Sequence, residues 1–251
     1  SITAYVTQAA MKTLAGLAGT GLGIPGASPA AQEESVLPVS VQATYLYGGE
    51  QFDMMDYIAP VYIAILGMFF VFLLACISFL RERSQGTMER LAATPASRFE
   101  IVLGYMLGLG LFGLIQVTVI LFFTVWVIGI HYNGSLALIL LIVAIMAVVG
   151  VILGILASAF ARTEFQVLQF IPLVIFPQVL LGGTFWAVSD MPTYLQPFAY
   201  AMPIYYANIA LRDVMLKGWG LAEIWPNLAI LTGIGIVLVI LSALMMRREV
   251  A

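Results

Sequence analysis

Five long stretches of the chain contain no Asp, Glu, Lys or Arg, and this pattern limits the fold more than any other feature. A helix needs about 20 mostly apolar residues to cross the ~30 Å hydrocarbon core of a bilayer, and each stretch is at least that long. The stretches are residues 57–80, 101–130, 135–161, 165–189 and 225–246. Of the 251 residues, 62% are hydrophobic and 9% are charged, whereas a soluble domain has about 25% charged residues. We therefore predict an all-α integral membrane protein with five transmembrane helices, and the composition excludes a water-soluble enzyme.

The distribution of basic residues predicts how the helices are oriented. With five spans, seven of the ten Lys and Arg residues fall on one side and three on the other. The seven are Arg81, Arg83, Arg90, Arg98, Arg162, Arg247 and Arg248, and the three are Lys12, Arg212 and Lys217. Because short cytoplasmic loops carry an excess of Lys and Arg, we predict that the loop 81–100 and the C-terminus are cytoplasmic.

Residues 191–211 are also uncharged, but prolines at positions 192, 197 and 203 interrupt them. A sixth span here would place Arg247 and Arg248 outside the cell, against the basic-residue distribution. We therefore interpret residues 190–218 as a re-entrant or interfacial hairpin on the outer side. Since proline removes a backbone donor and breaks a helix, we expect residues 192–206 to form two short helical pieces.

The first 56 residues differ from residues 57–251, which form the transmembrane domain in this interpretation. They are extracellular by the same distribution of charge, and residues 36–47 are compatible with a strand. The chain begins with Ser1 rather than Met and shows no basic segment or cleavage motif of a signal peptide. We expect residues 1–56 to be the end of a larger extracellular segment whose preceding span is missing.

Residues that carry catalytic or cofactor chemistry are scarce. The single Cys76 and the single His131 exclude a Cys-rich or His-cluster metal site. The glycine pattern Gly108-x-Gly110-x-x-Gly113 matches a dinucleotide fingerprint, but it lies inside an uncharged span with no preceding strand. The chain also lacks the G-x-x-x-x-G-K-[ST] loop that cradles phosphate. We predict no catalytic residue, no metal site and no cofactor in this chain.

Two pairs of glycines, Gly104 with Gly108 and Gly150 with Gly154, lie one helical turn apart within the spans. Small residues at this spacing let two helix backbones approach closely. Packing within the bundle is the favoured interpretation, and an interface between subunits is the alternative.

The loop 81–100 holds the longest polar sequence between two spans, Arg81-Glu-Arg-Ser-Gln-Gly-Thr-Met-Glu-Arg-Leu-Ala-Ala-Thr-Pro95. We predict a short helix at about residues 87–93, capped by Thr87 and ended before Pro95. Ser97 and Glu100 then match a capping box at the start of the next span. The loop is either an ordinary solvated connection or a docking helix for a cytoplasmic partner.

This loop and the outer hairpin together resemble the membrane (permease) subunit of type-2 ATP-binding-cassette (ABC) exporters. The resemblance covers about residue 53 to the C-terminus. The family often has a lysine where this chain has Tyr105. Family members usually have six spans, so the first span is missing here by comparison. The hairpin residues that carry the resemblance are Pro192-x-x-Leu195, Pro203-x-x-Tyr206, Arg212 and Gly218.

The resemblance implies a dimer, homomeric or heteromeric, of such subunits in the cytoplasmic (inner) membrane, in contact with lipids and bound to cytoplasmic ATPase subunits. ATP and Mg would be bound by that ATPase, and no nucleic acid is involved. The residues implied in coupling to the ATPase are Glu82, Gly86, Thr87, Met88, Glu89, Arg90, Leu91, Thr94 and Pro95. The residues implied in an outer gate are Pro192, Leu195, Pro203, Tyr206 and Arg212.

Three functions remain open from the sequence. The favoured one is ATP-driven export of a lipophilic or amphipathic substrate, a drug-like compound or a lipid, because few polar residues are available to line a path. These are Gln116, Thr118, Gln166, Gln169, Gln178 and Thr184. The alternative is a secondary transporter driven by an ion gradient, although its spans usually contain ionisable groups. An intramembrane enzyme is the third, and it would need a nucleophile, a base or a metal site.

Overall fold

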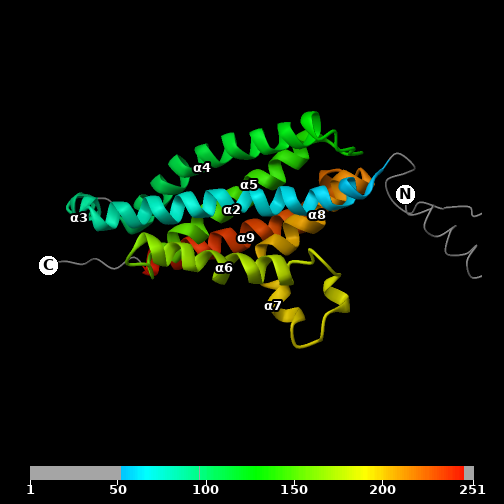
Figure 1. Ribbon diagram of the computed structural model, residues 1–251. Coiled ribbons are helices and arrows are strands. Elements are labelled where there is room, and N and C mark those ends of the chain that lie inside the picture. The colour runs from blue at the N-terminus through cyan, green and yellow to red at the C-terminus, as the bar shows by residue number, and fades with distance from the viewer. Residues whose placement is uncertain (1–51, 96, 246–251) are drawn as a thin grey trace, which may run out of the picture. The chain divides into compact units, whose positions relative to one another are not determined.

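The computed structural model describes residues 52–95 and 97–245, and five long apolar helices dominate them. The helices α2 (Met54–Ser84), α4 (Arg98–Phe122), α5 (Leu136–Ser158), α6 (Glu164–Leu181) and α9 (Leu221–Met245) are shown in Figure 1. A π-helical turn, η2 (Phe123–Val127), continues α4. Each of the five is long and apolar enough to cross a bilayer, and the described residues contain no strand. The predicted all-α fold with five spans is therefore confirmed.

The short helices lie at opposite ends of these long helices (Figure 1). The helix α3 (Thr87–Ala92) connects α2 to α4. The helices η3 (Val188–Asp190), α7 (Gln196–Tyr200) and α8 (Pro203–Lys217) connect α6 to α9. We refer to the two ends as the α3 end and the α8 end.

The helix α5 forms the centre of the packing, in contact with α2, α4, α8 and α9. Its contact with α2 depends on Gly150 and Gly154. A Cβ atom on Gly150 would lie 2.8 Å from the carbonyl oxygen of Met68, and one on Gly154 would lie 2.5 Å from that of Phe72. Only glycine allows the backbones to come this close, so this pair packs within the bundle, as favoured from the sequence.

The other pair, Gly104 and Gly108 of α4, is arranged differently. A Cβ atom added at either position would have no heavy atom of the described residues within 4 Å, apart from the neighbouring backbone of α4 itself. The pair therefore does not serve close helix packing within the described chain, and a role at a subunit interface stays a prediction.

Residues 191–211 do not form one continuous helix. Pro197 lies in the first turn of α7, and Pro203 begins α8, at positions where a missing backbone donor costs nothing. The helical pieces are thus separated at the prolines, as expected. However, α8 has 15 residues and packs on α2, α5 and α9, so the second piece is much longer than predicted. Its re-entrant position in a membrane remains a prediction.

The extracellular segment predicted for residues 1–56 falls almost entirely outside the described residues. The helix α2 begins at Met54, so the last three residues assigned to that segment are helical. The possible strand at residues 36–47 also lies outside the described residues.

Candidate functional site

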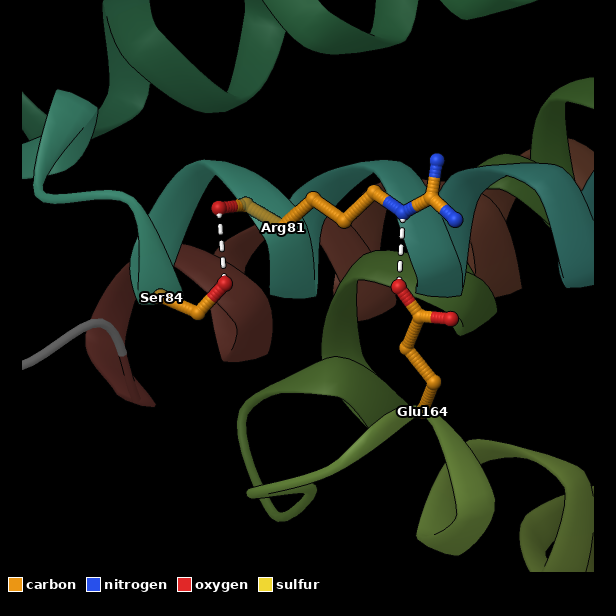
Figure 2. A network of polar contacts seen from close by, with 3 residues as sticks. All are labelled: Arg81, Ser84 and Glu164. Carbon is orange, nitrogen blue, oxygen red and sulfur yellow. Dashed lines mark hydrogen bonds and ion pairs between the residues drawn. The ribbon is translucent and has the colours of Figure 1, made fainter.

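The last turn of α2 is attached to the first turn of α6 at the α3 end (Figure 2). The Nε atom of Arg81 donates a hydrogen bond to Oε1 of Glu164 over 2.7 Å, and the Ser84 hydroxyl donates to the Arg81 carbonyl over 3.0 Å. Both charged side chains are more than half exposed, 58% for Arg81 and 56% for Glu164. Such an exposed pair contributes little to stability, but it defines how the two helix ends lie against each other.

A second arginine joins α2 to α5. The Nη1 atom of Arg83 donates to the carbonyl oxygens of Ala159 and Ser158 over 3.2 and 3.5 Å. The last carbonyls of a helix have no partner within it, and a cation is favourable there because of the helix dipole. The sequence interpretation ended this span at residue 80 and used Arg81 and Arg83 only to assign the cytoplasmic side. Because α2 continues to Ser84, both arginines lie in its last turn, and this bracing role was not predicted.

The turn between α2 and α3 requires glycine. Gly86 has φ = 74°, in the left-handed region that favours glycine. The helix α3 begins at Thr87. A capping Thr87 would instead place the first helical residue at position 88. The helix ends at Ala92, and the carbonyl of Leu91 accepts hydrogen bonds from the backbone N–H and the hydroxyl of Thr94. Pro95 follows, as expected.

The predicted capping box at the start of α4 is confirmed. The backbone N–H of Glu100 donates to the Ser97 hydroxyl over 3.2 Å, and the backbone N–H of Ser97 donates to Oε2 of Glu100 over 2.7 Å. Further along α4, Tyr105 packs edge-on against Phe79 of α2, with ring centroids 5.0 Å apart. Both ends of the loop that carries α3 are therefore fixed in place.

The predicted coupling residues lie on this braced loop. Glu82, Gly86, Thr87 and Leu91 are half-buried, whereas Arg90, Thr94 and Pro95 are exposed. The side chains of Met88 and Glu89 lie outside the described residues. The structure thus presents α3 as a short helix with exposed polar residues at the end of four braced spans, α2, α4, α5 and α6.

At the opposite end, polar side chains connect α6 and the segment after it to α8. We call this connection the α6–α8 latch. It consists of Gln178, Gly182, Gly183, Thr184, Asn208 and Arg212.

The latch pairs side chains with backbone groups. The backbone N–H of Ile204, in the first turn of α8, donates to the Gln178 side-chain oxygen over 3.3 Å. The Asn208 amide donates to the Gly182 carbonyl over 2.9 Å. Gln178 is 3% exposed and Asn208 is 1% exposed. Because a buried polar group without a partner is costly, these bonds specify where α8 begins relative to α6.

Arg212 closes the latch. Its Nη1 and Nη2 atoms donate to the carbonyls of Gly183 and Thr184 over 3.1 and 3.3 Å. Burial lowers the pKa of the Arg212 guanidinium from its ordinary value, which lies so far above neutrality that the group stays charged. Gly183 has φ = 71°, and a Cβ atom on Gly182 would collide with Ile204. The segment needs both glycines to reach the guanidinium.

The remaining residues of the predicted outer gate stabilise the segment around α7. The Tyr206 hydroxyl donates to the Tyr200 carbonyl over 2.9 Å, and the Leu195 N–H donates to the Pro192 carbonyl over 2.8 Å. Pro203 is buried at the start of α8. Asn208 was not among the residues predicted for a site, although it stands between apolar residues in an uncharged segment, which was the available signal.

The six residues predicted to line a path lie in different places in the described chain. Gln116 of α4 donates to the Leu66 carbonyl of α2 over 3.1 Å, and Thr118 donates to Leu114 within its own helix. Their role in a path remains a prediction. Of the others, Gln166 accepts a hydrogen bond from the Arg162 N–H at the start of α6, Gln169 is exposed, and Gln178 and Thr184 belong to the latch.

Comparison with known proteins identifies a family. Residues 1–244 match the family model described as ABC-2 family transporter protein. The chain is 28% identical over 214 residues to ABC transporter G family member 20 of Dictyostelium discoideum, covering 84% of this chain and 29% of that protein. It is 28% identical over 176 residues to the probable multidrug ABC transporter permease YbhR of Escherichia coli K12, covering 70% of this chain and 48% of that protein.

A third relative is the linearmycin resistance permease protein LnrN of Bacillus subtilis, 30% identical over 146 residues, covering 58% of this chain and 37% of that protein. The chain thus spans about a third to a half of the length of these three relatives.

Proposed function

Because the chain belongs to the ABC-2 family of transporter proteins, and is therefore the multi-pass membrane component of an ABC transporter, we propose that it forms the export path of an ATP-driven exporter. A separate cytoplasmic ABC ATPase subunit would bind ATP and Mg and supply the free energy. A second permease subunit, identical or related, would complete the path. Catalysis belongs to the partner, and this chain converts the partner's movement into a rearrangement of its helices.

The observation that carries this proposal is the bracing of the α3 end. Arg81 connects α2 to α6, Arg83 connects α2 to α5, and the Ser97–Glu100 capping box fixes the start of α4. A force applied to α3 would therefore reach α2 and α4 through the chain, and α5 and α6 through the arginines of α2. A loosely connected loop would absorb the same force by bending.

The substrate class follows from the polarity of the spans and from the relatives. The five spans are strongly apolar, and relatives are named for multidrug transport and for linearmycin resistance. An apolar path favours a lipophilic or amphipathic substrate, because a strongly polar cargo would lose its hydration without gaining hydrogen bonds. We propose a drug-like compound or a lipid, moved outward across the cytoplasmic membrane.

The orientation belongs to the same proposal. The α3 end carries Arg81, Arg83 and Arg162, whereas Arg212 and Lys217 lie on α8. By the positive-inside rule, the α3 end faces the cytoplasm and the ATPase. The α6–α8 latch then closes the outer side.

The coupling role of α3 is tested with the double substitution Met88→Ala, Leu91→Ala. These are the apolar residues of the helix at helical spacing, and interface anchors typically contribute roughly 1–3 kcal/mol each. We expect the variant to insert in the membrane as the unaltered protein does, but to retain less ATPase on co-purification and to lose substrate-stimulated ATP hydrolysis. The matched control is Arg162→Gln, an exposed residue at the same end but outside α3. Unchanged ATPase retention and unchanged stimulation in the double variant would refute the coupling role.

A further inference from the structure

The helix α6 is the least buried of the five spans, whereas its neighbour α8 is densely packed. Of the 18 residues of α6, only three are buried, Val167, Ile175 and Gln178. Of the 15 residues of α8, ten are buried. A segment with few buried contacts separates from its neighbours at a lower free energy than a densely packed one. Of the two helices joined by the latch, α6 is therefore the freer to move.

The two ends of α6 are attached to the bundle in different ways. At the α3 end, Glu164 pairs with Arg81 of α2, and Val167 lies in a buried apolar cluster with residues of α2. Beyond Ile175, the one buried residue of α6 is Gln178, which belongs to the latch. The first half of α6 is thus held by apolar packing and an ion pair, and the α8 end by the hydrogen bonds of the latch.

Two prolines lie between the packed part of α6 and its α8 end. Pro172 and Pro177 are both inside the helix. Each removes an intrahelical hydrogen bond and crowds the preceding turn, and sharp bends in helices are concentrated at proline. The half of α6 after Pro172 can therefore bend away without moving the half that is bound to α2.

The opposite side of α8 is bound to the loop before α5. The Asn133 backbone N–H donates to the Met215 carbonyl over 2.9 Å, and the Asn133 side-chain amide donates to the Leu216 carbonyl over 3.1 Å. A Cβ atom on Gly134 would collide with Val214, so the loop approaches α8 more closely than any other residue would allow. Together with its packing on α2, α5 and α9, these contacts fix α8 to the bundle.

We propose that residues 173–184 form a gate arm that swings away from α8, while α8 stays on α2, α5 and α9. Gln178, Asn208 and Arg212 hold the arm closed. Their hydrogen bonds break at little net cost where water replaces the lost partners, and the gap between α6 and α8 lets the substrate leave at the outer surface. That the gap faces outward and opens with ATP rests on the proposed function, whereas the unequal attachment of the two sides of α8 does not.

The test compares two buried positions on opposite sides of α8. Ile204 contacts Gly182 of the gate arm, and Val214 contacts Gly134 of the loop before α5. Both side chains are 0% exposed. Ile204→Cys and Val214→Cys, each in a Cys76→Ala background, are assembled with the ATPase in lipid nanodiscs, where both membrane faces are accessible, and their reaction with a hydrophilic thiol reagent is timed.

The gate arm predicts that only one of the two cysteines responds to ATP. A minor conformation is typically populated at roughly 0.1–10%, so a shift toward the open arm should speed the reaction of Ile204→Cys at least about 10-fold during hydrolysis. The reaction of Val214→Cys should stay unchanged, because that side of α8 remains packed.

Arg212→Ala opens the arm without ATP. The substitution removes the donors to the Gly183 and Thr184 carbonyls. In the protein without its ATPase, we expect Ile204→Cys to react about 10-fold faster in this variant, and Val214→Cys to react as before. A factor of ten corresponds to about 1.4 kcal/mol, near the lower limit for hydrogen bonds of a charged group.

Two further variants make this comparison secure. Lys217→Ala removes another cation of α8, one that pairs with Asp213 of the same helix, and it should leave the reactivity of Ile204→Cys unchanged. Gln178→Leu removes the acceptor of the Ile204 backbone N–H, and it takes the place of Arg212→Ala if that variant does not fold.

Three results are decisive. Unchanged reactivity of Ile204→Cys, both in the latch variant and during hydrolysis, would overturn the proposal. A faster reaction of Val214→Cys than of Ile204→Cys during hydrolysis would also overturn it, because α8 would then leave the bundle. A faster reaction of Ile204→Cys in Arg212→Ala, with no response to ATP, would support the gate arm and contradict the ATP-driven opening in the proposed function.

Discussion

At the scale of single residues, the latch shows how this protein places polar side chains in an apolar environment. Gln178, Asn208 and Arg212 all pair with backbone groups at the start of α8 or in the turn after α6. Backbone groups at helix ends lack intrahelical partners, and where they are buried they need a partner from elsewhere in the chain. The polar side chains of the latch therefore serve the ends of helices, in contrast to Gln116, which donates to the Leu66 carbonyl within the spans.

Asn208→Ala tests this use of polar side chains. The substitution leaves the buried Gly182 carbonyl without the amide donor it has now, and an unsatisfied buried group costs about 1–3 kcal/mol. Because the side-chain oxygen of Asn208 has no partner among the described residues, we expect a loss near the lower end of that range. Thermal unfolding in detergent measures it, with exposed Gln169→Ala as the control expected to change stability by less than about 0.5 kcal/mol. A loss no larger than that of the control would contradict the role of the latch in stability.

At the scale of helices, the end of α2 connects α3 to the rest of the bundle. Arg81 and Arg83 extend from its last turn to α6 and to α5. The two contacts differ in kind: the first is an exposed ion pair, and the second satisfies carbonyls at the end of a helix. We expect the first to matter for the transmission of movement more than for folding.

Exchanging the charges of Arg81 in α2 and Glu164 in α6 separates an effect on the transmission of movement from an effect on folding. Arg81→Glu and Glu164→Arg each place like charges at the contact, and we expect each single variant to fold normally but to export more slowly. The double variant restores opposite charges and should recover most of the export rate. Export from cells and unfolding in detergent are measured in parallel. If the double variant is as slow as the slower single variant, the pair does not transmit movement.

The elements differed in how far the sequence could predict them. The spans were predictable because a long uncharged run has one plausible fold in a bilayer, and the Ser97–Glu100 capping box because its partners are three residues apart. The latch was not predictable as a unit, since its hydrogen bonds join residues 26 to 29 positions apart. The length of α8 was not predicted, because its buried face depends on packing against other helices, among them α2, α5 and α9. The prolines in the sequence indicate only where a helix begins.

At the scale of the whole molecule, the proposed function depends on orientation. In a Cys76→Ala background, we expect Ser84→Cys to be protected from a membrane-impermeant thiol reagent in intact cells, and Ser135→Cys and Tyr194→Cys to react. Ser84, Ser135 and Tyr194 are exposed side chains, so the labelling reports sidedness and not burial. Permeabilised cells provide the control, in which all three should react. Labelling of Ser84→Cys in intact cells would reverse the orientation and remove α3 from the reach of a cytoplasmic ATPase.

In the proposed function, ATP hydrolysis by a partner, and no ion gradient, drives export through this chain. The most direct measurement uses proteoliposomes containing the protein with its ATPase and a lipophilic substrate. We expect transport that requires ATP and Mg and continues when ionophores collapse all ion gradients. Transport that continues without ATP, and stops when the gradients are collapsed, would contradict it.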